Sequence, residues 1–151
     1  MSVCKFIAAD VPLQEVRPSK DYPVHIDIDN RTIDDGGTDD NFFLFPFKDV
    51  RDYTNKKHGV CLEWNYTEGR AELILDYIKE NLKKTEEIEL WHVWLMDYYE
   101  YEESPVIKKR TISISEMTIQ DIKELDNAEI WNHPDKHLPV RPSFYCIKVG
   151  R

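Results

Sequence analysis

Residues 87–96, Glu-Ile-Glu-Leu-Trp-His-Val-Trp-Leu-Met, decide how this chain folds. The run is rich in apolar and aromatic side chains and is typical of a β-strand. Side chains alternate between the two faces of a strand. Here one face carries Ile88, Leu90, Trp94 and Met96, and the other carries Trp91, Val93 and Leu95. Both faces are apolar, so both need to be covered, because an exposed apolar edge promotes aggregation.

The segments around this strand alternate between strand and helix patterns. Strands are predicted at residues 59–66, 106–114 and 143–149. A helix is predicted after Thr67, which suits an N-cap, and a second helix after Ser115 or Thr118 to about Leu125. The apolar positions at helical spacing are Ala71, Ile74, Leu75, Ile78 and Leu82 in the first helix, and Met117, Ile119, Ile122 and Leu125 in the second.

From residue 59 the order is therefore β-α-β-β-α-β, which resembles the ferredoxin-like split βαβ fold. This resemblance implies an α+β class with two helices on one face of an antiparallel sheet. It also implies a spatial strand order of last, first, third, second, which puts strand 87–96 at an edge. We expect the N-terminal strands to cover that edge, with a second chain as the alternative.

The first third of the chain is expected to extend or cap this core. Strands are predicted at 3–9, 24–29 and 42–45, a loop at 30–41, and a helical turn within 47–58. We expect residues 1–151 to form a single domain, in which 1–58 supply strands and an acidic loop and 59–151 supply the split βαβ core.

Composition excludes several classes of function. The chain has 151 residues and a net charge of −9, which disfavours binding to nucleic acid. No secretory signal or membrane span is expected, and the three scattered cysteines fit reduced thiols in the cytoplasm. No nucleotide-binding, hydrolase or zinc motif occurs, so no cofactor is predicted. A monomer or a homodimer is expected.

An acidic loop is the sharpest local feature. Six carboxylates fall between Asp27 and Asp40, and we take Asp34, Asp35, Asp39 and Asp40 as candidate binding residues. Asp27, Asp29, Asp34 and Asp35 are secondary candidates for a divalent metal, although their spacing is not that of an EF-hand. A solvated turn is the alternative interpretation.

A second acidic segment follows strand 87–96. It interleaves aromatic rings with carboxylates, a combination that suits a partner rich in Lys and Arg. The candidate binding residues are Trp91 within the strand and, in the segment that follows it, Tyr98, Tyr99, Glu100, Tyr101, Glu102 and Glu103. A wet hairpin loop with its tyrosines lying flat is the alternative.

Catalysis has little support in the sequence. Glu63 and His92, with Asn65 nearby, are secondary candidates for acid–base chemistry if they share a face of the sheet. We therefore expect a small acidic binding module that docks a basic partner protein, with an immunity or inhibitor protein as the concrete version. The alternative is a small-ligand or metal-binding protein, or an enzyme, that uses the acidic loop or the open face of the sheet.

Overall fold

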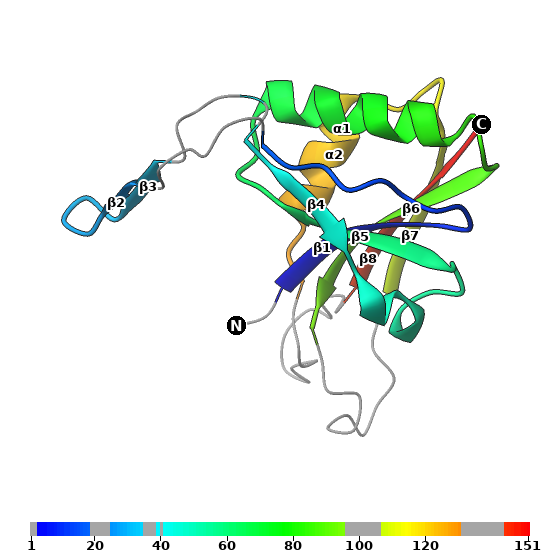
Figure 1. The fold of residues 1–151 in the computed structure, drawn as a ribbon, viewed down its shortest axis with the longest axis horizontal. Coiled ribbons are helices and arrows are strands. Elements are labelled where there is room, and N and C mark those ends of the chain that lie inside the picture. The colour runs from blue at the N-terminus through cyan, green and yellow to red at the C-terminus, as the bar shows by residue number, and fades with distance from the viewer. Residues whose placement is uncertain (1–2, 19–24, 35–38, 40, 96–106, 131–143) are drawn as a thin grey trace.

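A six-stranded sheet forms the centre of the molecule (Figure 1). The structure is a computed structural model that describes residues 3–18, 25–34, 39, 41–95, 107–130 and 144–151. The strands lie side by side in the order β4-β5-β1-β6-β8-β7. Their bounds are Phe43–Pro46 (β4), His58–Glu63 (β5), Val3–Ala9 (β1), Glu87–Trp94 (β6), Phe144–Gly150 (β8) and Ile107–Ser113 (β7).

The α+β class is confirmed, but the ferredoxin-like arrangement is not. Strand β1 lies between β5 and β6 and pairs antiparallel with both. Strand β6 also pairs antiparallel with β8, so the prediction that it lies at an edge is wrong. The sheet is mixed, because β7 and β8 are parallel neighbours joined through a helix.

Burial explains why β1 and β6 lie inside the sheet. Six consecutive residues of β6, from Ile88 to Val93, are buried, as are the last four of β1. An interior strand needs apolar side chains on both faces, whereas edge strands tolerate proline and charge. Strand β4 ends at Pro46, and β7 carries Lys108, Lys109 and Arg110. The N-terminal strand therefore covers β6, as expected, by pairing with it directly.

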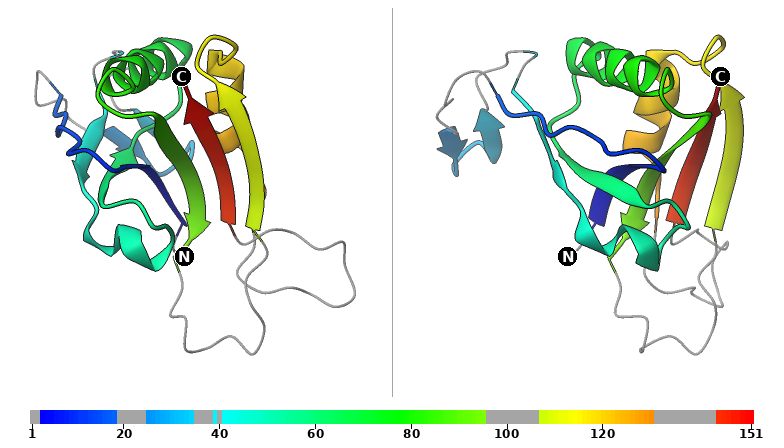
Figure 2. Two further views of the ribbon diagram at one scale, coloured as in Figure 1. Left: turned by 90° about the vertical axis from the view of Figure 1, so that its right-hand side faces the viewer. Right: turned by 45° about the vertical axis from the view of Figure 1, so that its right-hand side comes forward.

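Two helices cover one face of this sheet (Figure 2). Helix α1 spans Glu68–Asn81, and its N-cap Thr67 accepts a hydrogen bond from the backbone N–H of Arg70. Helix α2 spans Ile119–Asp126, and Thr118 forms a capping box with Asp121. Both caps satisfy backbone donors that the first helical turn leaves unpaired. Of the two caps predicted for the second helix, the structure has Thr118.

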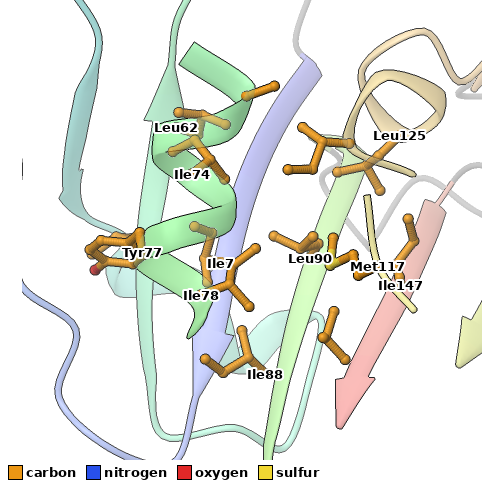
Figure 3. Close-up of a cluster of buried hydrophobic side chains, with 14 of the residues drawn as sticks. Ile7, Leu62, Ile74, Tyr77, Ile78, Ile88, Leu90, Met117, Leu125 and Ile147 are labelled. Carbon is orange, nitrogen blue, oxygen red and sulfur yellow. The ribbon is translucent and has the colours of Figure 1, made fainter. Parts of the chain in front are cut away.

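The main core lies between these helices and the sheet (Figure 3). Helix α1 contributes Ala71, Ile74 and Ile78 of the predicted stripe, Leu82 follows directly after it, and α2 contributes two of its predicted positions. The buried members labelled in Figure 3 are Ile7, Leu62, Ile74, Tyr77, Ile78, Ile88, Leu90, Met117, Leu125 and Ile147. Leu75 and Ile119, also predicted, are only partly buried. We call this side of the sheet the helix face.

The opposite side of the sheet has a smaller cluster, and we call it the open face. Phe6, Trp91, Val93 and Phe144 are buried there with small side chains from β1 and β8. The 3₁₀ helix η1 (Lys48–Asp52) packs Val50 against them, which confirms a helical turn within residues 47–58. Among the described residues, no α-helix covers this face.

A two-stranded ribbon stands apart from the main sheet (Figure 1). Strand β2 (His25–Asp27) pairs antiparallel with β3 (Thr32–Asp34). The expected strand at 24–29 therefore ends two residues earlier than predicted, and the expected loop at 30–41 contains a strand. The turn between them places Arg31 at φ 54°, a left-handed conformation that non-glycine residues adopt rarely.

Candidate functional site

A charged pocket opens on the open face of the sheet. Its volume is about 420 Å³, which lies within the range of roughly 300–1,000 Å³ of known ligand pockets. Strands β6, β7 and β8 form its floor, and the segment that follows η1 forms its wall. The lining residues are Asp10, Arg51, Asp52, Tyr53, Thr54, Asn55, Lys56, Glu87, Glu89, Trp91, Lys109 and Lys148.

Strand alternation and register bring the floor of the pocket together. On β6, Glu87, Glu89 and Trp91 face the pocket because they alternate with residues of the main core. Glu89 lies directly opposite Lys148 on β8. Trp91 lies opposite Cys146, which in turn lies opposite Lys109 on β7. The pocket thus has carboxylates on β6 beside lysines on β8 and β7.

Glu89 is the most unusual group in this pocket. Only 3% of its surface is exposed. Its carboxylate accepts a hydrogen bond from the Thr54 hydroxyl, and the Cys146 thiol lies 3.9 Å from its other oxygen. No basic group of the described chain lies within ion-pair distance of it. A buried carboxylate without a cationic partner is costly, because folding removes its hydration.

Two lysines beside Glu89 also lack acidic partners in the described part of the chain. Within the described residues, neither Lys109 nor Lys148 forms an ion pair. The Lys109 ammonium lies 5.9 Å from the centre of the Trp91 ring, which is a cation–π distance. Burial, reinforced by the negative charge of Glu89, raises the pKa of the Cys146 thiol, while both lysines oppose this shift. Cys146 is therefore a neutral thiol under the pocket floor.

A third lysine lines the pocket near Glu87. Lys56 lies 3.4 Å from a carboxylate oxygen of Asp10 and 3.2 Å from one of Glu87. Burial lowers the pKa of Lys56, but hydrogen bonds and attraction from Glu87 and Asp10 outweigh burial and raise it. Lys56 therefore neutralises these two acids, whereas no described basic residue does so for Glu89.

Trp91 does not lie on the surface as a docking residue would. It is 1% exposed and stacks on Phe6 at a ring distance of 5.8 Å. Its indole N–H is buried and has no hydrogen-bond partner among the described residues. The ring forms part of the pocket floor, so the expectation that Trp91 joins an exposed aromatic patch is not met.

The predicted acidic loop is described only in part. Asp39 is exposed, and its carboxylate lies 3.3 Å from the Thr67 hydroxyl at the start of α1. Asp34 ends β3, and Asp29 lies exposed in the turn of the ribbon. Asp27 accepts two hydrogen bonds from Asn30, at 3.0 and 2.9 Å, which lower its pKa. The remaining candidates, Asp35, Asp40, Tyr98, Tyr99, Glu100, Tyr101, Glu102 and Glu103, lie outside the described residues.

The two secondary catalytic candidates lie on opposite faces of the sheet. Glu63 ends β5 on the open face and is exposed. His92 is buried on the helix face, where its Nδ1 lies 2.8 Å from the carbonyl oxygen of Leu125. Burial lowers the pKa of His92. The structure therefore does not bring them together, and the backbone contact gives His92 a structural role. Asn65 lies before α1, where its carbonyl accepts from Arg70 at 2.8 Å.

The sequence carries a signal for this pocket that the predicted sites do not include. Charged side chains stand at alternate positions of otherwise apolar strands, at Glu87 and Glu89 on β6 and at Lys148 on β8. Such residues face a common side of the sheet. Nothing in the sequence alone places Thr54 or Lys56 over them, because those contacts depend on how η1 folds back onto the sheet.

Neither a metal centre nor a membrane-spanning helix is present in the described part of the chain. Within it, no group of three or more His, Cys, Asp or Glu side chains is placed to hold a metal ion. Neither described helix has the length and apolar character needed to cross a membrane. Comparison with protein-family models, with curated proteins and with solved structures gave no match.

Proposed function

We propose that this chain is a binding protein whose open-face pocket takes a small molecule carrying both an ammonium group and an anionic group. The observation that carries the proposal is Glu89, a buried carboxylate that has two lysines nearby and no ion pair within the described residues. The ammonium group would lie at Glu89, and the anionic group would lie at Lys109 and Lys148.

The chemistry of the lining favours such a zwitterion over a simple ion. A single anion would satisfy the lysines and leave the Glu89 carboxylate without a cation. A single cation would do the reverse. A free α-amino acid carries both charges a few bonds apart, as the opposed Glu89 and Lys148 require. Charge-assisted hydrogen bonds of this kind are about twice as strong as neutral ones.

Thermal unfolding of the full chain with added amino acids tests this proposal. A ligand at 100 times its dissociation constant stabilises the folded state by about 2.7 kcal/mol. We expect stabilisation by at least one amino acid. We expect none from its N-acetyl derivative, which lacks the ammonium group, or from its amide, which lacks the carboxylate. Equal stabilisation by the derivatives would contradict the proposal that the ligand needs both charges. No stabilisation by any amino acid would contradict amino acids as the class of ligand.

Matched variants of neighbouring residues locate the binding site. Lys109→Met and Glu89→Gln should each weaken binding about tenfold or more, since each removes a charge-assisted contact. Lys108→Met is the control, because Lys108 is the adjacent residue on β7 and lies over Tyr145, at 4.9 Å, on the other face. Equal losses in Lys108→Met and Lys109→Met would place the ligand elsewhere.

A second candidate function is docking of a basic protein. A row of exposed carboxylates along α1 favours it, formed by Glu68, Glu72, Asp76 and Glu80 at intervals of four residues. Leu73, which is 40% exposed, lies beside this row. Carboxylates on one helix face attract a basic partner and speed its association. Asp39 lies near the N-terminal end of the same helix.

A salt-dependent pull-down with matched charge variants tests this second candidate. The triple variant Glu68→Gln, Glu72→Gln, Asp76→Asn should lose a partner that the unmodified chain captures at low salt. The control neutralises three other exposed acids, Asp49, Glu86 and Glu116, and so changes the net charge equally. Equal loss in both variants would indicate nonspecific attraction to the net charge of the protein.

A further inference from the structure

Two cysteines far apart in sequence face each other across adjacent strands. The Sγ atoms of Cys4 on β1 and Cys61 on β5 lie 3.1 Å apart. The strands are antiparallel neighbours, and Phe6 is the direct partner of Cys61, so the two cysteines lie diagonally on the open face. Both are free thiols. A disulfide has an S–S length of about 2.05 Å, so a movement of about 1 Å would join them.

The two thiols differ in exposure and in the direction of their pKa shifts. Cys4 is 8% exposed, whereas Cys61 is only partly buried. The hydrogen bond between them, with burial, raises the pKa of Cys4. The same hydrogen bond lowers the pKa of Cys61, although burial and Glu63 act in the opposite direction. Cys61 is the more exposed of the two thiols and is therefore the better placed nucleophile, and Cys4 lies where it can donate a hydrogen bond to the Cys61 thiolate.

We propose that Cys4 and Cys61 form a dithiol modification site that reacts with hydroperoxides and closes to a reversible disulfide. In the first step the Cys61 sulfur attacks a peroxide oxygen, the O–O bond breaks, and Cys61 becomes a sulfenic acid while water or an alcohol leaves. In the second step the Cys4 sulfur attacks the Cys61 sulfur and expels water. Two thiols are oxidised to one disulfide, and one peroxide is reduced.

Cys146 supplies an internal control for this chemistry. It is fully buried, and its pKa is raised by burial and by the charge of Glu89. A buried, neutral thiol is inert toward peroxide. The proposal does not depend on the ligand proposed for the pocket, because neither Cys4 nor Cys61 lines that pocket.

Oxidation of the full chain by hydrogen peroxide, followed by alkylation in denaturant and intact mass measurement, tests the proposal. We expect the unmodified chain to lose two hydrogens and to accept one alkyl group, at Cys146. Dithiothreitol should restore three alkylation sites. Tryptic mapping should place the disulfide between Cys4 and Cys61. A disulfide between two chains, or three reactive thiols after peroxide, would overturn it.

Single variants separate the two roles. Cys61→Ser should slow oxidation about tenfold or more, whereas Cys4→Ser should leave a Cys61 sulfenic acid that dimedone traps. Cys146→Ser should behave as the unmodified chain. Phenylarsine oxide, which bridges two close thiols, should bind the unmodified chain and Cys146→Ser but neither of the other variants. This second probe needs no peroxide and is used on folded protein. Circular dichroism would verify that each variant is folded. Arsenical binding that survives Cys4→Ser, or equal oxidation rates in all variants, would overturn the assignment.

Discussion

The same strands present apolar side chains to a core on one face of the sheet and charged side chains to a pocket on the other. On the helix face, β6 presents Ile88 and Leu90 to a core closed by α1 and α2. On the open face, the same strand presents Glu87 and Glu89 to a charged pocket, beside Trp91. Each face receives alternate residues of one strand. The difference between the two faces therefore comes from the alternation of side chains along one strand, and not from separate regions of the sequence.

This comparison separates the face that stabilises the fold from the face at which binding is proposed. The helix face has the larger apolar cluster and two capped helices, and burial of apolar surface is the dominant stabilising term in folding. Among the described residues, Phe47, η1 and the residues after it pack on the open face. Variants on the helix face should change stability, and variants on the open face should change binding.

The largest effect is expected from Ile78→Ala on the helix face. Ile78 is fully buried in α1 (Figure 3), and truncation of such a residue costs about 2–5 kcal/mol. Urea denaturation would measure the loss. Leu73→Ala is the control, because Leu73 lies on the same helix but is 40% exposed, and its effect should be within about 0.5 kcal/mol. Similar losses at both positions would contradict the assigned core face.

A smaller effect on stability is expected from Val50→Ala on the open face. Val50 is 3% exposed and is the buried residue of η1. Loss of its methyl groups should cost about 1–2 kcal/mol in the free energy of unfolding, at about 0.8 kcal/mol for each carbon removed. Unlike Ile78→Ala, it should also weaken ligand binding, because residues 51–56 of the pocket wall lie at the end of η1 and directly after it. Lys48→Ala, at an exposed position of the same turn, should change neither property.

Thr67→Ala should have a still smaller effect, confined to stability. Its hydroxyl accepts the hydrogen bond from the backbone N–H of Arg70 at 3.1 Å, and loss of an N-cap costs about 1 kcal/mol. Thr67→Ser keeps the hydroxyl and should retain most of the stability. Urea denaturation of both variants would measure the difference. A change in amino acid affinity with Thr67→Ala would show that the two faces are coupled.

The sequence predicted the elements of this fold better than their arrangement. Most strands and both helices were expected close to their observed bounds, because alternation and helical spacing are local patterns. The strand order was not predicted, since pairing of β1 with β6 joins residues 79 to 91 positions apart, from Ala9 with Ile88 to Val3 with Trp94. The doubly apolar run at 87–96 did predict that it must be covered, with the N-terminal strands as the favoured cover, and β1 pairs with it.

The candidate site was harder to predict, for a physical reason. A cluster of acidic residues can be recognised when its members are close in sequence, as between Asp27 and Asp40, and such clusters predicted binding sites in loops. The pocket instead collects single charges from β6, β7, β8 and the segment after η1. Glu89 and Lys148 meet only because β6 pairs with β8, and no local sequence pattern identifies these two strands as neighbours.

The last and smallest effect concerns pH and the buried His92 of β6. His92 lies on the helix face, where burial lowers its pKa; Lys5 lowers it further, and Asp126 and the Leu125 carbonyl act in the opposite direction. The unfolded chain takes up this proton near pH 6.5, whereas the folded chain resists it until a lower pH. The unfolded state thus binds more protons as pH falls below about 7, so His92 makes the protein less stable in acid.

His92→Asn should therefore flatten the acid side of the stability profile. Asparagine can still donate to the Leu125 carbonyl but cannot take up a proton in this range. The free energy of unfolding, measured by urea denaturation between about pH 7 and pH 5.5, should fall more in the unmodified chain than in this variant. Glu89→Gln, on the open face of the same strand, is the comparison that keeps His92 in place. If Glu89→Gln flattened the profile and His92→Asn did not, the acid sensitivity would belong to the pocket and not to the core.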